Sequence, residues 1–89
     1  MSWNVKVVKR VLKEVKRFSK KDVKRLFSVL EGLAEDPYQG SIEKIRGEKN
    51  IWRRRCGNYR ILYEVISRGK YVYIFQIRRR TTTTYRKQK

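Results

Sequence analysis

The stretch IWRRRCGNYRILYEV, residues 51–65, joins an arginine-rich run to an aromatic, β-branched run through a Gly-Asn pair. Two strand-like segments separated by two turn-forming residues predict a β-hairpin. Gly57 and Asn58 both tolerate the positive φ angles of a primed turn, which is the favoured connection for such a short loop. In the register that follows, Cys56 faces Tyr59 across the turn.

The same register places Arg55 opposite Arg60 and Arg53 opposite Leu62. Side chains alternate along a strand and cross-strand partners point to the same side, so Arg53, Arg55 and Arg60 are predicted to share one face of the sheet. Like charges placed opposite each other are destabilising. The cluster therefore predicts an anion site, with phosphate as the first ligand to consider. A solvated basic face is the alternative interpretation of any charge run.

The chain has 89 residues, which predicts a single domain over residues 1–89. Twenty-five Lys and Arg residues stand against eight Asp and Glu, giving a net charge of +17 and a pI near 10.6. Such a charge attracts polyanions, so nucleic acid or a nucleoprotein is the expected partner.

Several classes of function are excluded by what the sequence lacks. No apolar run approaches the length of a membrane span and no signal-peptide pattern opens the chain, so we expect a cytoplasmic protein without a membrane partner. Histidine is absent and Cys56 is the single cysteine. Histidine-based acid–base catalysis, Ser-His or Cys-His dyads, zinc sites with His ligands and Cys-based metal sites are thereby excluded. No metal or cofactor is expected.

The order of elements predicts an α+β fold. Alternation over residues 3–7 predicts a strand, and apolar spacings of three and four predict two helices separated near Ser19, the second ending at Asp36-Pro37. Residues 37–50 are interpreted as a loop. After the hairpin come a turn over residues 67–70 and a strand over residues 71–77. We therefore expect an N-terminal strand, an antiparallel helical hairpin and a three-stranded antiparallel meander, with the helices on one sheet face.

The last strand is predicted to pair with the second strand of the hairpin, placing Leu62 opposite Phe75 and Glu64 opposite Tyr73. Aromatic residues within the strand patterns are expected in the core and not on a base-stacking surface. They are Trp52, Tyr59, Tyr63, Tyr71, Tyr73 and Phe75. Arg54 alternates with core positions, so it must leave the core by its aliphatic stem or lie at an edge.

In this register Ile77 lies beside Arg60, which brings Arg78, Arg79 and Arg80 to the arginine end of the sheet. The basic tail, residues 78–89, contains Tyr85. An aromatic ring in a basic tail can stack on an unpaired base or fold back on the sheet edge.

The sequence resembles the RelE/ParE superfamily of toxin–antitoxin toxins, and archaeal RelE-type members in particular. The similarity lies in the basic helical hairpin, in IEKIRGEKNIWRRRCGNYRILYEV and in IFQIRRRTTTTYRK. It implies a RelE-like fold and a metal-independent, ribosome-dependent endoribonuclease, which cuts mRNA in the ribosomal A site by attack of a ribose 2′-OH. The implied partners are the ribosome, mRNA and a RelB-like antitoxin with an acidic, partly disordered binding segment.

The resemblance also implies the site residues. In order, they match a basic pair, a phosphate-gripping arginine, an arginine before the tail and a base-stacking tyrosine. The matching positions are Arg53, Arg55, Arg60, Arg79 or Arg80, and Tyr85.

The general base is left open by these residues, since arginine, with a pKa above about 12, accepts a proton poorly. Either orientation and electrostatics activate the 2′-OH, or a carboxylate such as Glu48 accepts its proton. Glu64 is the other carboxylate near the cluster in sequence. Two alternative functions are a ParE-like inhibitor of DNA gyrase and a non-catalytic, basic RNA-binding protein.

Overall fold

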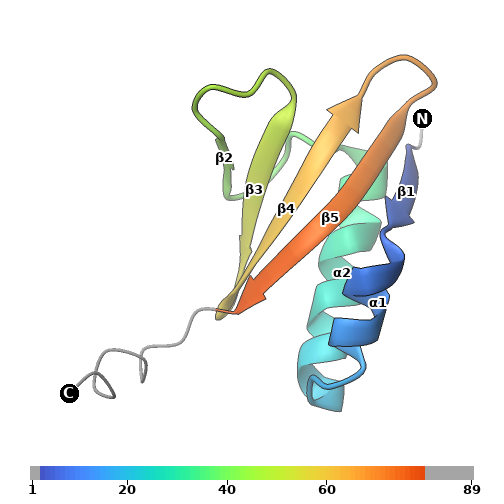
Figure 1. The fold of residues 1–89 in the computed structure, drawn as a ribbon, viewed down its shortest axis with the longest axis vertical. Coiled ribbons are helices and arrows are strands. Elements are labelled where there is room, and N and C mark those ends of the chain that lie inside the picture. Colours follow the sequence, from blue (N-terminus) through green and yellow to red (C-terminus); the bar gives the residue numbers. More distant parts are fainter. Residues whose placement is uncertain (1–2, 80–89) are drawn as a thin grey trace.

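Seven elements follow one another in residues 3–79, the part of the chain that the computed structural model describes (Figure 1). They are β1 (Asn4–Val7), α1 (Lys9–Val15), α2 (Lys20–Glu35), β2 (Ile42–Lys44), β3 (Ile51–Cys56), β4 (Tyr59–Ile66) and β5 (Tyr71–Arg79). The predicted α+β fold is confirmed. No helix among these residues is long and apolar enough to cross a membrane.

The sheet has five strands in the order β1-β5-β4-β3-β2. The N-terminal strand β1 runs parallel to β5, and all other neighbours are antiparallel. The interpretation of residues 37–50 as a loop is wrong for Ile42–Lys44, which pair with Trp52–Arg54 of β3. A strand of three residues has little signal of its own, because the partner strand decides whether it forms.

Both helices lie on one side of the sheet, and the core fills the space between (Figure 1). The buried apolar side chains come from alternate sheet positions and from the inner stripes of the helices. They are Val11, Leu26, Leu30, Leu33, Cys56, Tyr59, Ile61, Tyr63, Val65, Val72, Ile74 and Ile77. The opposite sheet face is covered by no element within residues 3–79, and we call it the open face.

The β3–β4 hairpin has the predicted register, with Cys56 opposite Tyr59 and Arg55 opposite Arg60. In the turn only Gly57 has a positive φ angle, of 60°. This is the pattern of a type II′ turn, which needs glycine at its first central position alone. The Tyr59 hydroxyl donates a hydrogen bond to Asp22 Oδ2 at 2.8 Å, which ties the turn end of the hairpin to the start of α2.

A β-bulge in the β4–β5 pair shifts the register by one residue. Glu64 lies opposite Tyr73 as predicted, but beyond the bulge Leu62 lies opposite Gln76, and not opposite Phe75. Phe75 is the extra residue, and its carbonyl oxygen accepts a hydrogen bond from Arg10 Nη2 of α1 at 2.9 Å. The shift turns Ile77 toward the helices, where it is buried, because a one-residue slip moves each following side chain to the other face.

The Tyr63 hydroxyl anchors the chain after α2. It donates to the carbonyl oxygen of Pro37 at 2.6 Å, and both residues are fully buried. We expect Tyr63→Phe to lower the free energy of unfolding by about 1–3 kcal/mol, because a buried carbonyl would lose its partner. Urea unfolding followed by circular dichroism measures the change. Tyr73→Phe, on the open face, is the matched control and should change stability by less than about 0.5 kcal/mol.

Ionisation of the Tyr63 hydroxyl is expected to lower the stability of the protein at high pH. Burial raises the pKa of Tyr63 from 10.0 to about 12, so the folded chain holds this proton more tightly than the unfolded chain. The stabilisation is complete below pH 10 and is lost as the pH rises through 12. A Tyr63→Phe variant should lack this component of the high-pH unfolding curve, and equal curves for the two proteins would contradict the assignment.

Candidate phosphate-binding site

Four arginines from three adjacent strands lie on the open face near the hairpin turn. Arg55 of β3 is opposite Arg60 of β4, and Arg60 is opposite Arg78 of β5. Arg53 lies two residues before Arg55 on the same face. We call Arg53, Arg55, Arg60 and Arg78 the arginine cluster. Guanidinium groups have a planar geometry that suits phosphate, and strands fix their positions more firmly than loops do.

Arg78 joins the cluster where the sequence had predicted Arg79 or Arg80. The structure brings Arg79 to the same end of the sheet, but Arg79 pairs with Tyr59 and so lies on the helix side. The bulge causes this exchange, because it reverses which β5 positions face outward. Arg80 and Tyr85 lie outside the described residues.

Glu43 is a member of the site that the sequence had not suggested. It lies opposite Arg53, and its carboxylate accepts a hydrogen bond from Arg53 Nη2 in an ion pair. That bond and the charge of Arg53 lower the pKa of Glu43, with smaller contributions from Arg55 and Arg60. Glu43 is therefore the ion-pair partner of the Arg53 guanidinium. In the sequence, the apolar Ile42 followed by the charged Glu43, shortly before the predicted hairpin, was the pattern that could have indicated a strand here.

A hollow of about 180 Å³ lies beside this ion pair, between β2 and β3. It is lined by Ser41, Ile42, Glu43, Arg53 and Arg55. One carboxylate and two guanidiniums thus line a small hollow beside the arginine cluster.

The other two carboxylates considered lie away from the cluster. Glu48 is in the connection from β2 to β3, at the opposite end of β3 from Arg55. Glu64 is on the open face opposite Ile51, four residues from Arg60, or about 13 Å along the strand.

Neither cysteine chemistry nor a metal is suggested by the described residues. Cys56 is buried, and burial raises the pKa of its thiol, which reduces the reactive thiolate. No group of three or more Cys, Asp or Glu side chains within residues 3–79 could hold a metal ion.

Arg54 lies on the helix side of β3, and its charged group is satisfied outside the core. Its Nη1 donates to the carbonyl oxygen of Gln39 at 2.8 Å. The aliphatic stem thus carries the charged group out of the core, which is the first of the two alternatives that the sequence had left open. The second does not hold, because β3 lies between β4 and β2 and is not an edge strand. Gly40 lies against this guanidinium, and a Cβ atom there would come within 2.1 Å of Arg54 Nη1.

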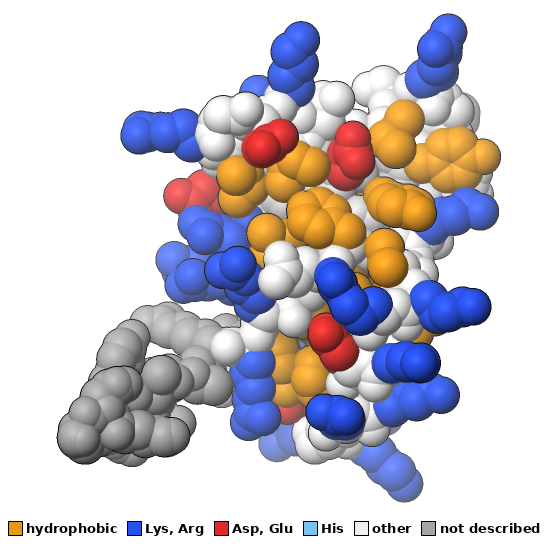
Figure 2. Space-filling model, in the orientation of Figure 1, with side chains coloured by type: hydrophobic (Ala, Val, Ile, Leu, Met, Phe, Trp, Pro, Cys, Tyr) orange, Lys and Arg blue, Asp and Glu red, His pale blue; other side chains and the backbone are white. Residues whose placement is uncertain are grey.

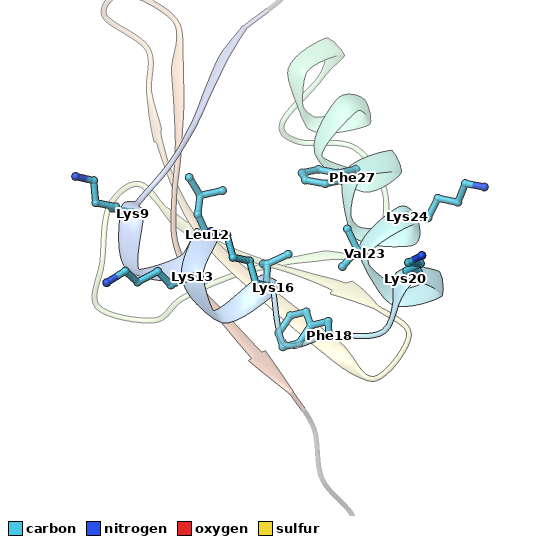
Figure 3. Close-up of a pocket in the computed structure, with 10 residues that line it drawn as sticks. Lys9, Leu12, Lys13, Lys16, Phe18, Lys20, Val23, Lys24 and Phe27 are labelled. Carbon is cyan, nitrogen blue, oxygen red and sulfur yellow. The ribbon is translucent and has the colours of Figure 1, made fainter.

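A second surface feature is a groove of about 870 Å³ between α1 and α2 (Figure 3). Its floor is apolar, and lysine side chains project at its rim (Figure 3). The apolar lining residues are Leu12, Val15, Phe18, Val23 and Phe27, and the lysines are Lys9, Lys13, Lys16, Lys20 and Lys24. Leu12 and Phe27 are 44% and 48% exposed, and no acidic residue lines the groove.

Comparison with known proteins places this geometry in a family. The sequence pattern described as "ParE toxin of type II toxin-antitoxin system, parDE" matches residues 2–83. The chain therefore belongs to this toxin family, within the RelE/ParE superfamily. It is similar to the RelE1 protein of Methanocaldococcus jannaschii, with 30% identity over 83 residues, covering 90% of this chain and 92% of that protein.

Solved structures agree on the fold. The archaeal RelE-RelB complex of Pyrococcus horikoshii contains a chain similar to this one, with a TM-score of 0.81 and 25% identity over 92% of this chain and 99% of that one. The RelB-RelE complex of Methanococcus jannaschii gives a TM-score of 0.67 and 26% identity over 82% of this chain and 87% of that one.

Proposed function

We propose that this toxin is a ribosome-dependent endoribonuclease that cuts mRNA in the ribosomal A site and so stops translation in the cytoplasm. The observation that supports the proposal is the arginine cluster, in which four guanidiniums lie on a sheet face that no element within residues 3–79 covers. Only Arg53 among them has a carboxylate partner within the described residues. The remaining donors are free to bind a phosphodiester.

The chemistry proposed here is the one that the resemblance to RelE toxins implies. The ribose 2′-oxygen attacks the adjacent phosphorus, the bond from phosphorus to the 5′-oxygen breaks, and the products are a 2′,3′-cyclic phosphate and a 5′-OH. Negative charge grows on the phosphoryl oxygens as the fifth bond forms. Arg55, Arg60 and Arg78 act as fixed donors that stabilise this charge, which is the largest contribution that such a site can make.

Orientation is the better-supported way of activating the 2′-OH. Glu48 is at the far end of β3, and Glu43 is held ionised in its pair with Arg53, which weakens it as a base. The cluster instead holds the phosphate so that the 2′-oxygen is in line with the leaving oxygen. The 2′-OH proton leaves to water or to a ribosomal group, and the 5′-oxygen takes a proton from solvent.

The test is a translating cell-free extract dosed with the protein, with mRNA 5′ ends mapped by primer extension. Cuts within codons that disappear when ribosomes are omitted are the expected result. A parallel supercoiling assay with purified DNA gyrase tests the alternative. Intact messages together with inhibited gyrase would replace the nuclease by a gyrase inhibitor, and no effect in either assay would leave a plain RNA-binding protein.

We infer that the groove between α1 and α2 binds an acidic amphipathic helix of a RelB-like antitoxin. The similar chains of Pyrococcus horikoshii and Methanococcus jannaschii were solved as complexes of RelE with RelB. An amphipathic helix would place its apolar face against Leu12 and Phe27, and its acidic residues would meet the surrounding lysines. Five lysines and no carboxylate line the groove, so its charge favours an acidic occupant over a basic one.

A further inference from the structure

Two tyrosines on β5 contradict the expectation that the strand aromatics are core residues. Tyr71 is 37% exposed and Tyr73 is 42% exposed. They occupy alternate positions, so both lie on the open face, where Tyr73 is opposite Glu64 and Tyr71 is opposite Ile66. The core-directed neighbours Val72 and Ile74 are fully buried. The sheet therefore presents two phenol rings on the same face as the arginine cluster.

Two cations, Lys6 of β1 and Arg10 of α1, lie along the edge of β5 that faces β1. Lys6 is the neighbour of Tyr73 in the parallel β1–β5 pair, and its Nζ lies 5.7 Å from the centre of the Tyr71 ring. Further along the same edge, Arg10 reaches the carbonyl oxygen of Phe75. Figure 2 shows hydrophobic side chains gathered across one face of the molecule, with a few acidic side chains among them and Lys and Arg side chains around them.

The tyrosine pair and the arginine cluster lie on the same sheet face, one step apart along β4. The step from the Arg60–Arg78 pair to the Glu64–Tyr73 pair is four residues on β4, or about 13 Å. Apolar and amide side chains, Leu62 and Gln76, fill the interval. Glu64 is on the β4 side of Tyr73, so a polyanion is repelled there and attracted to the β1 side.

The geometry points to a binding site for single-stranded RNA on the open face, in which unpaired bases stack on Tyr73 and Tyr71 while their phosphates follow Lys6 and Arg10. The inference rests on the proposed function, because it extends the strand held at the arginine cluster by the neighbouring nucleotides. Aromatic rings beside a row of cations are the usual combination for binding a single strand without reading its sequence. A protein partner is less favoured on the open face, because the apolar face of a partner helix would bind in the groove between α1 and α2, on the other side of the molecule.

Binding of a 5′-labelled 12-nucleotide RNA to the full chain, measured by fluorescence anisotropy without ribosomes, tests the site. Tyr73→Thr removes the ring and keeps a β-branched residue suited to a strand, whereas Tyr73→Phe keeps the ring. We expect Tyr73→Thr to weaken binding about tenfold, since one stacked base contributes on the order of a tenfold to hundredfold factor. Tyr73→Phe should bind within about twofold of the unmodified protein.

Salt dependence separates stacking from charge. Tyr73→Thr should leave the slope of log K against log salt unchanged, while Lys6→Ala should reduce it by about 0.7, the value for one phosphate contact on a single strand. Phe27→Ala is the matched control, because Phe27 is an aromatic residue of similar exposure in the helical groove. It should bind RNA normally.

The outcomes distinguish this site from the proposed function. Unchanged affinity in Tyr73→Thr, with weaker binding in Arg60→Ala, would overturn the stacking site and leave the arginine cluster in place. Normal RNA binding combined with weaker antitoxin binding in Tyr73→Thr would make the open face a protein interface. Weaker RNA binding in Tyr73→Thr by a protein that cuts no message on ribosomes would support the site and contradict the nuclease.

Discussion

An Arg60→Ala variant is expected to cut mRNA on ribosomes roughly 100- to 1,000-fold more slowly while keeping its fold. Arg60 is the centre of the arginine cluster, with Arg55 opposite it on β3 and Arg78 opposite it on β5. Removing the central guanidinium takes away the donor between the other two. A phosphoryl group bound there would lose contact with at least one side of the cluster.

Arg60→Ala is expected to lose activity but not stability. Two like-charged neighbours face Arg60 across the sheet, and such pairs are destabilising. Arg60→Ala relieves both, so we expect the free energy of unfolding to stay constant or to rise by up to about 1 kcal/mol. A functional arginine held among like charges should behave in this way, whereas a structural arginine would lower stability when removed.

Primer extension in a translating extract measures the cleavage rate, and urea unfolding followed by circular dichroism measures stability. Arg68→Ala is the matched control, because Arg68 is an exposed arginine in the β4–β5 turn at the other end of the sheet. It removes the same charge and should cut at the normal rate. An unfolded Arg60→Ala protein, or one that cuts as fast as Arg68→Ala, would remove Arg60 from the proposed mechanism.

The hairpin could be predicted from sequence because its register is a local property. A two-residue loop allows only one register between the two strands. The positions of Arg53, Arg55 and Arg60 could therefore be predicted once Gly57-Asn58 was identified as the turn. The arginine contributed by β5 could not be assigned in this way. It depends on a bulge that buries Ile77 and whose extra carbonyl is satisfied by Arg10, sixty-five residues away in the chain. The spacing of the buried residues Val72, Ile74 and Ile77, two and then three, was the one local sign of the bulge.

The exposure of Tyr71 and Tyr73 was beyond sequence reasoning for a related reason. Tyr71, Val72, Tyr73 and Ile74 are all residues that favour strands, so the run resembles a strand buried on both faces. Which face is covered depends on where the helices pack. β2 poses the same problem, since it takes its place from its pairing with β3.

A substitution in the groove between α1 and α2 is expected to weaken antitoxin binding strongly. Phe27→Asp is expected to raise the Kd for a RelB-like antitoxin by roughly 30-fold or more, because an aromatic anchor at the centre of an interface contributes at least about 2 kcal/mol. The substitution removes the largest exposed ring of the groove floor and adds a carboxylate that repels acidic side chains of the bound helix. Since Phe27 is 48% exposed in the free chain, its fold should tolerate the change.

Titration calorimetry with the purified antitoxin measures the affinity. Ser28→Asp is the matched control, since it adds the same charge at an exposed neighbouring position of α2 that does not line the groove. It should keep the affinity within about twofold. Binding of Phe27→Asp that is as tight as that of Ser28→Asp would show that the antitoxin docks elsewhere.

The variant also separates neutralisation from toxicity. The groove and the open face lie on different sides of the molecule, with the helices packed against one face of the sheet and the arginine cluster on the other. Phe27→Asp should therefore cut mRNA at the normal rate and resist added antitoxin, so that translation stays blocked at antitoxin concentrations that rescue the unmodified protein. Loss of cleavage in this variant would instead mean that the groove is part of the surface that engages the ribosome.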